Sequence, residues 1–141
     1  MPEVMELVEG DGYAAANIEQ IGEGPGFRKI RRVLGVTAFG INAVVLPAGI
    51  ETGTHWHDEQ EETYFVHRGK VEFEFGDGSK VVLGPGGVVR VDAATHRKLR
   101  NVGDEDAVYV IAGGKGGYVG RDGRAPEGEQ RVQAEPPGAA T

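Results

Sequence analysis

Two histidines and two acidic residues stand close together in one short stretch of the chain. His55 and His57 are separated by one residue, and Glu61 and Glu62 follow soon after. In an extended strand, residues two apart project from the same face, so both imidazoles can reach a single ion. Neutral imidazole suits Zn, Fe, Cu or Ni, and a carboxylate completes a mixed nitrogen and oxygen ligand set. The spacing therefore indicates a site for one divalent metal ion.

Glycines frame these residues at fixed intervals. The order is Gly49, five residues, His55, one residue, His57, four residues, Glu62, six residues and Gly69. This order resembles the first motif of the cupin superfamily at every fixed position. The resemblance implies a small jelly-roll β-barrel in which His55, His57 and Glu62 hold the metal inside. It also selects Glu62 over Glu61, because only Glu62 has the motif's spacing to Gly69.

The segment GPGGVVRVDAATHRKLRN matches the second cupin motif only in general character. If its Asn101 is the family's asparagine, the position of the third histidine holds Arg97 and not His96. Strand alternation agrees, because an inward Leu99 turns Arg97 inward and His96 outward. A β-bulge between His96 and Leu99 would return His96 to the interior. Two alternatives stay open: His96 is a fourth ligand, or three protein ligands suffice and Arg97 binds an anionic ligand.

Strand parity also predicts which way the aromatic residues and His67 near this site face. Tyr64 shares the parity of Glu62, so it is a candidate for the substrate pocket beside Arg97, although core packing is the commoner fate of such a residue. His67 has the opposite parity and is expected to face outward. Trp56 should face away from the two histidines and pack against a second layer. No catalytic residue can be named from these patterns.

Short apolar stretches alternate with turn signals from Phe27 onward, with roughly ten residues per strand, which is typical of an all-β sandwich or barrel. We expect a lead-in that is helical or irregular over residues 1–26 and the cupin-like barrel over 27–112. A Gly/Pro-rich arm should follow over 113–141, with a disordered tail from about Ala125. FRKIRRVLG is interpreted as a strand whose basic residues are solvated or protect an edge.

Three strand predictions concern the centre of the barrel. Residues 71–75 alternate apolar and acidic side chains, and the GDG that follows indicates a hairpin turn into residues 80–83. The stretch 63–67 is expected to pair with 71–75. It is apolar on both faces, which suggests cover by a second sheet or a subunit partner. Three aromatic residues are assigned to the core: Phe39, Phe73 and Phe75.

The composition excludes several kinds of chemistry. Of 141 residues, 24 are glycine, far above the usual share of roughly 7%, so long helices are disfavoured. A net charge of −7 would repel phosphate backbones, so no nucleic-acid partner is expected. The absence of cysteine excludes disulfides, thiolate metal sites and cysteine nucleophiles. No targeting segment or membrane span is recognised, so a cytoplasmic protein without a membrane partner is expected.

The resemblance implies metal-dependent chemistry on a small organic molecule, of dioxygenase, isomerase or lyase type. The implied cofactor is one divalent Fe, Mn, Zn or Ni ion, and the implied assembly is a homodimer, as is common for single-domain cupins. The alternative is a metal-poor small-molecule binding or regulatory module that uses Arg97 for an anionic ligand. A barrel with only a structural role also stays open. Whether the protein is an enzyme is therefore not decided by the sequence.

Overall fold

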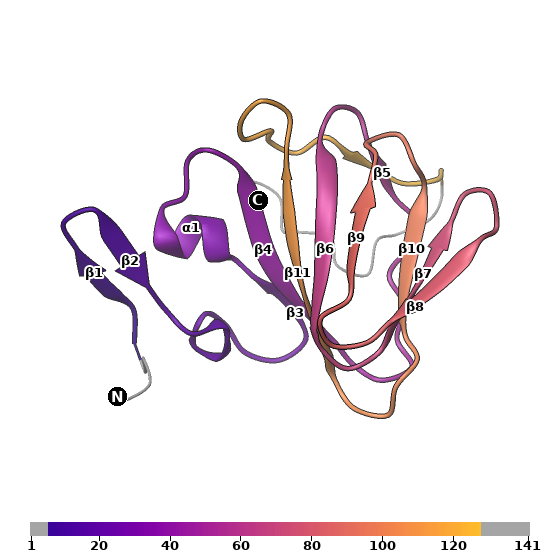
Figure 1. The fold of residues 1–141 in the computed structure, drawn as a ribbon, viewed down its shortest axis with the longest axis horizontal. Helices are drawn as coiled ribbons and strands as arrows, with labels where there is room; N and C mark the ends of the chain where they lie inside the picture. The colour runs from indigo at the N-terminus through magenta and orange to yellow at the C-terminus, as the bar shows by residue number, and fades with distance from the viewer. Residues whose placement is uncertain (1–5, 128–141) are drawn as a thin grey trace.

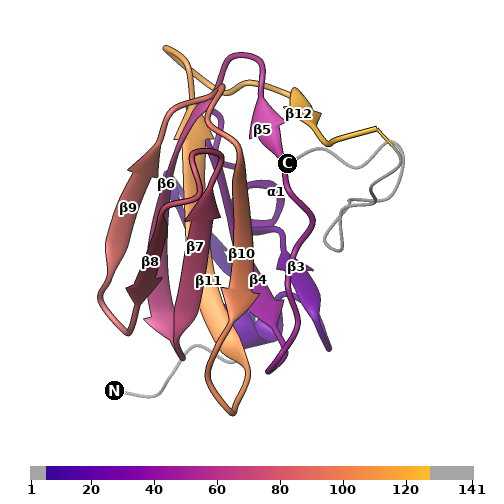
Figure 2. The same cartoon turned by 90° about the vertical axis from the view of Figure 1, so that its right-hand side faces the viewer.

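Two facing antiparallel sheets form the body of the protein in the computed structural model, which describes residues 6–127 (Figure 1, Figure 2). The larger sheet has five strands in the order β3 (Gly26–Arg28), β4 (Gly40–Leu46), β11 (Ala107–Gly114), β6 (Glu61–Arg68) and β9 (Val88–Val91). The smaller sheet has three, in the order β10 (Arg97–Asn101), β7 (Val71–Phe75) and β8 (Lys80–Leu83). This architecture confirms the predicted all-β sandwich.

The core lies between the two sheets because each strand turns alternate side chains inward. From the smaller sheet, Val71, Phe73 and Leu99 are almost completely buried. The facing strands contribute a second set of buried side chains: Val44, Leu46, Tyr64, Val66, Val91, Ala107 and Tyr109. The expectation that Phe73 belongs to the core is confirmed, and Phe75 packs against this cluster while staying partly buried. Phe39 is not a core residue, since 43% of it is exposed.

The remaining elements lie at the edges and ends of the sandwich. The N-terminal lead-in contains a hairpin of β1 (Val8–Gly10) and β2 (Tyr13–Ala15), which stands away from the barrel in Figure 1, and a 3-10 helix (Ile18–Gln20). A short strand pair, β5 (Trp56–His57) with β12 (Gly123–Arg124), closes one end of the barrel (Figure 2). Within residues 6–127, no helix has the length and apolar character that a membrane crossing requires.

The prediction of one strand for FRKIRRVLG is wrong beyond its first residues. Strand β3 ends at Arg28, and the helix α1 (Ile30–Leu34) follows at once. Gly35 ends this helix in the left-handed region at φ 76°, and its amide donates to the carbonyl of Arg31. Arg28 is also not solvated: it is 5% exposed and its Nη2 donates to the carbonyl of Gly24 at 2.8 Å.

The predicted pairing of 63–67 with 71–75 is wrong as well. Strand β6 lies between β11 and β9 in the larger sheet, whereas β7 pairs with β10 and β8 in the smaller one. The chain crosses between the sheets at Gly69, where φ is +86° and a Cβ would lie 2.8 Å from the Cα of Ala107. Only glycine fits this crossing. Within the single chain the outer face of β6 is not covered, because Phe65 is 40% exposed.

The hairpin turn between β7 and β8 agrees with the prediction. Gly78 adopts φ +86°, and its amide donates to the carbonyl of Phe75 at 2.9 Å. After β11 the chain returns across one end of the barrel as the C-terminal arm, residues 115–127, which contains β12. The part of the expected disordered tail after residue 127 lies outside the described residues.

Candidate metal centre

Backbone hydrogen bonds hold the first histidine against the smaller sheet. His55 and Arg97 exchange two backbone hydrogen bonds of 2.9 Å, which places His55 beside β10. His57 follows in β5, whose partner β12 belongs to the C-terminal arm. As expected for residues two apart in an extended segment, both imidazoles face one side, with ring centroids 5.3 Å apart. Trp56 between them points the other way and stacks on His96.

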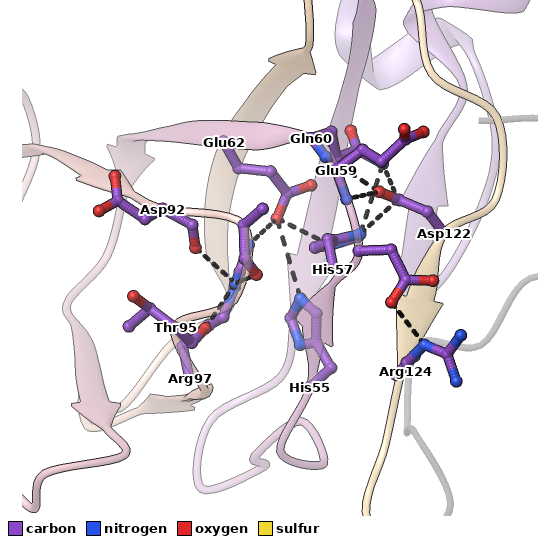
Figure 3. Close-up of polar contacts among 12 residues, drawn as sticks. His55, His57, Glu59, Gln60, Glu62, Asp92, Thr95, Arg97, Asp122 and Arg124 are labelled. Carbon is purple, nitrogen blue, oxygen red and sulfur yellow. Dashed lines mark hydrogen bonds and ion pairs between the residues drawn. The ribbon is translucent and has the colours of Figure 1, made fainter.

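Glu62 enters the same space from the start of β6 (Figure 3). Its Oε1 lies 3.2 Å from Nε2 of His57 and 3.9 Å from Nε2 of His55. All three residues are buried, and one donor atom from each falls within 4.8 Å of the others. Glu61 faces outward instead and pairs with Arg90. The structure thus brings together the two histidines and the glutamate that the motif spacing selects.

Arg97 lies directly behind Glu62 and is completely buried. Its Nη2 donates to Oε1 of Glu62 at 2.7 Å, and its Nε donates to the hydroxyl of Tyr64 at 3.3 Å. Its Nη1 donates to backbone carbonyls, the shortest contact being 2.6 Å to Thr95. These contacts direct the guanidinium to groups of the protein itself. Arg97 is an internal counter-charge for Glu62.

The alternation of β10 decides the orientation that the sequence left open. Arg97, Leu99 and Asn101 are buried, and β10 pairs with β7 in continuous register, without a bulge. His96 precedes the strand, is exposed, and stacks on Trp56 with ring centroids 4.0 Å apart and planes 9° apart. His96 therefore lies outside the cluster of His55, His57 and Glu62, and the bulge that would bring it inside is not formed.

Neighbouring positive charge keeps Glu62 ionised although it is buried. Burial alone would raise the pKa of Glu62, but the His55 and His57 rings in their protonated form and the positive charge of Arg97 outweigh burial and hold the pKa well below its usual value. The hydroxyl of Tyr64 donates to Glu62 at 2.7 Å. Burial and the neighbouring negative charge raise the pKa of Tyr64 well above its usual value, so this hydroxyl stays protonated. The site thus holds a carboxylate, the form that binds metals.

A second carboxylate reaches His57 from the C-terminal arm. Oδ1 of Asp122 lies 2.8 Å from Nδ1 of His57, on the side of the ring opposite Glu62. Burial alone would raise the pKa of Asp122, but hydrogen bonds from the Gln60 side chain and from the amides of Gln60 and Glu59 lower it to about 2. An ionised carboxylate accepts hydrogen bonds and cannot donate them. The Nδ1 of His57 therefore carries the proton.

The remaining ring nitrogen of His57 has no hydrogen-bond partner among the described residues, although it is fully buried. Its contact with Glu62 is short, yet it lacks the geometry of a hydrogen bond. Two electron-rich atoms, Nε2 of His57 and Oε1 of Glu62, thus face each other in a buried site. A cation between them would give Nε2 of His57 the partner that it lacks, whereas Oε1 of Glu62 already accepts hydrogen bonds from Arg97 and Tyr64. Two imidazoles and a carboxylate also form the donor set that Zn, Fe, Mn or Ni accept, so the residues fit a metal ion.

A cavity of about 240 Å³ opens beside this cluster. One wall carries His55, His57 and Glu62, and the C-terminal arm adds Arg121 and Asp122. Apolar and aromatic side chains also line the cavity, and they form its apolar wall: Phe27, Ile41, Leu99, Tyr109 and Ile111. Tyr64 lines the cavity too, as its parity predicts, whereas Arg97 is absent from the lining.

Comparison with protein families shows which family the chain belongs to. Residues 42–113 match the cupin domain family, which is more than half of the chain. The protein belongs to the cupin family. A separate comparison with curated proteins finds no match. Together with the jelly-roll architecture, the family match confirms the resemblance that the spacing of Gly49, His55, His57, Glu62 and Gly69 predicted.

Solved structures with the same fold include proteins of several activities. A cupin protein from Bacteroides fragilis is 23% identical, with a TM-score of 0.63 over 74% of this chain and 85% of that one. A sugar phosphate isomerase of the cupin superfamily from Silicibacter pomeroyi is 22% identical, with a TM-score of 0.58 over 74% of this chain and 60% of that one. A DMSP lyase from Ruegeria pomeroyi is 26% identical, with a TM-score of 0.56 over 65% and 46%. This cupin thus spans less than two thirds of the isomerase and the lyase.

This cupin departs from its family's motif where Arg97 occupies the position of the third histidine. Sequence reasoning named that position but not what the guanidinium would contact. It also missed two residues, Asp122 and Gln60, which surround His57. No spacing rule could have found Asp122, because 65 positions of sequence separate it from His57. His67 faces outward and is exposed, as its parity predicts.

Proposed function

We propose that this cupin binds one divalent transition metal ion through His55, His57 and Glu62. We further propose that the ion activates a small organic molecule held in the adjoining cavity. The observation that supports binding is the contact between Nε2 of His57 and Oε1 of Glu62, which are 3.2 Å apart and not hydrogen-bonded. With the proton of His57 on Nδ1, the unpaired Nε2 lone pair faces a negatively charged carboxylate, and a cation between the two atoms would relieve their repulsion.

The surrounding residues shape the site for such an ion. Arg97 and Tyr64 each hold Oε1 of Glu62 at 2.7 Å, which fixes the carboxylate and compensates its burial. Three protein ligands leave positions on the ion for a substrate or water. When bound, a metal of this kind acts as a Lewis acid that polarises an oxygen of the substrate. The apolar wall excludes water and receives the carbon skeleton.

The cavity limits the substrate to a small molecule. A volume of about 240 Å³ corresponds to about eight water molecules, at roughly 30 Å³ each, and hence to a molecule of comparable size. We propose a substrate with a metal-binding oxygen at one end and an apolar body toward Ile41 and Ile111. An isomerase or lyase reaction is compatible with the activities of two structural relatives, a sugar phosphate isomerase and a DMSP lyase. A dioxygenase reaction, which the family resemblance also implies, is the remaining candidate.

Metal analysis of protein purified without a metal-chelating tag tests this proposal. We expect the wild type to retain close to one equivalent of a transition metal after gel filtration. The variant His57→Ala should lose it, while His67→Ala, which removes an exposed histidine on the other face of β6, should retain it. A His57→Ala variant with the metal content of the wild type would contradict the proposal.

No observation favours the alternative in which Arg97 binds an anionic ligand. The guanidinium is completely buried, and its donors go to Glu62, Tyr64 and backbone carbonyls. An anion in the cavity would meet Glu62 before it met Arg97. The metal-dependent function is therefore the one that the geometry supports.

The homodimer and the cytoplasmic location stay predictions. Phe65 and Val88 are paired neighbours on the outer face of β6 and β9, with exposed fractions of 40% and 63%. A second copy covering these side chains would supply the layer that the apolar character of β6 led us to expect. Light scattering during gel filtration tests the dimer, and a monomeric mass at micromolar concentration would contradict it.

A further inference from the structure

We propose that Asp122 is a positioning residue of the metal centre, which fixes the His57 ring with its proton on Nδ1 and its Nε2 lone pair toward the ion. This proposal rests on the proposed metal-binding function. It assigns a role in the site to the C-terminal arm, which lies outside the residues matched by the cupin domain family.

The hydrogen bonds around Asp122 use both oxygens of its carboxylate. Oδ1 accepts from Nδ1 of His57 at 2.8 Å and from Nε2 of Gln60 at 2.6 Å. Oδ2 accepts from the backbone amides of Glu59 and Gln60 at 2.8 and 2.9 Å. Figure 3 shows these contacts converging on one carboxylate beside the ring. Asp122 therefore ties His57 to the loop that leads into Glu62.

These contacts select one tautomer of His57. An Nδ1 without a proton would place two acceptors 2.8 Å apart, which a carboxylate does not tolerate. The amide of Gln60 lies farther from Nδ1, at 3.4 Å, and is already engaged by Asp122. Histidines that bind metals commonly donate their other ring N–H to a carboxylate, which fixes the orientation of the ring and raises its basicity. Asp122 occupies that position.

The register of the arm brings the carboxylate to this place. Strand β12 pairs Gly123 with His57, and the carbonyl of Asp122 accepts from the amide of Asp58 at 3.1 Å. Gly113 makes room for Gln60, because a Cβ there would lie 2.5 Å from Oε1 of that side chain. Both the C-terminal arm and the end of β11 are thus fitted to the surroundings of His57. Removal of the Asp122 charge should release the His57 ring while the barrel still folds, since Asp122 lies outside the core.

The experiment compares Asp122→Asn with Asp58→Asn. Asp58 is the matched control, because it directly follows β5, its carboxylate accepts from Nε of Arg124 in β12 at 2.6 Å, and its pairing is with Arg124 rather than with the His57 ring. Metal affinity is measured by calorimetric titration with Zn²⁺ of the metal-free full-length chain. We expect Asp122→Asn to lose about 10- to 100-fold in affinity, as for other partners of metal-binding histidines. Asp58→Asn should bind Zn²⁺ as tightly as the wild type.

A second readout uses nitrogen NMR of the metal-free protein, in which the chemical shifts of Nδ1 and Nε2 report the tautomer. We expect the Nδ1–H form of His57 in the wild type and in Asp58→Asn, and a mixture of tautomers in Asp122→Asn. Unchanged tautomer and Zn²⁺ affinity in Asp122→Asn would overturn the proposal. If Asp122→Asn does not fold, Asp122→Ala serves in the same comparison. If the wild type binds no Zn²⁺, the proposed function fails. The role of Asp122 in fixing the His57 ring is then tested only by whether the His57 tautomer changes in Asp122→Asn.

Discussion

The buried ion pair between Arg97 and Glu62 should dominate the stability of the metal-free protein. Arg97 is fully buried, and its removal by Arg97→Met leaves the charge of Glu62 in a site where only 10% of its side chain is exposed. Loss of one partner of a buried pair costs about 3–5 kcal/mol, because the remaining charge is desolvated without compensation. Methionine keeps most of the length of the side chain, so the change measures charge and hydrogen bonds more than volume.

Urea unfolding in the presence of a chelator measures this loss, because a bound metal would replace the missing positive charge. With a urea dependence of about 2 kcal/mol per M, a loss of about 4 kcal/mol lowers the midpoint by about 2 M. Arg100→Met is the matched control on the same strand. Its partner Glu72 lies 2.8 Å away, but 42% of the Arg100 side chain is exposed and solvent screens the pair, so we expect a much smaller shift of the midpoint.

A double variant separates the charge effect from packing. Glu62→Gln in the Arg97→Met background removes the unpaired charge. The double variant should therefore lose less free energy of unfolding than the sum of the losses of the two single variants, by more than about 1 kcal/mol. Equal midpoints for Arg97→Met and Arg100→Met would refute the reasoning, because a buried pair and an exposed pair would then contribute alike.

Three further outcomes follow from the site. Asp122→Asn should lower the free energy of unfolding above pH 3.8, and this difference from the wild type should shrink as the pH falls toward 2. The reason is that the pKa of Asp122 is about 2 in the folded chain, against a usual 3.8. Urea unfolding at a series of pH values measures this difference. Gly113→Ala should lose about 1–3 kcal/mol in the same assay, because its Cβ would lie 2.5 Å from Gln60 and 3.2 Å from Cγ of Glu62, whereas Gly120→Ala, with open space around it, should not. His96→Ala should leave the metal content measured by mass spectrometry unchanged, and a loss of metal would show that the exposed histidine is a ligand.

The local spacing of the motif was sufficient to predict the fold and most of the cluster. His55 and His57 lie two apart in an extended segment, so the sequence alone predicts that both rings project from the same face. The alternation of β10 likewise indicated an inward Arg97, although only the structure shows that Glu62 and Tyr64 engage it. Predictions of this kind succeed where the relevant contacts are set by strand parity.

The predictions that were wrong or missing concern contacts between distant segments of the chain and places where the chain changes direction. Strands 63–67 and 71–75 are neighbours in sequence, but the chain crosses between sheets at Gly69, which the alternation of side chains does not reveal. Phe39 is apolar and yet 43% exposed, since it stands before β4 and not within it. Asp122 reaches His57 only through the pairing of β12 with β5, so no local pattern could have assigned it.

The most direct test of the metal centre is an anomalous difference map from crystals of tag-free protein, recorded at the absorption edge of the metal found by elemental analysis. We expect one peak, about 2.0–2.2 Å from a nitrogen of His55, a nitrogen of His57 and an oxygen of Glu62, and no peak beside His96. The absence of a peak between these three side chains in crystals grown with excess metal would contradict the proposed metal centre. Nε2 of His57 would then instead donate a hydrogen bond to Glu62.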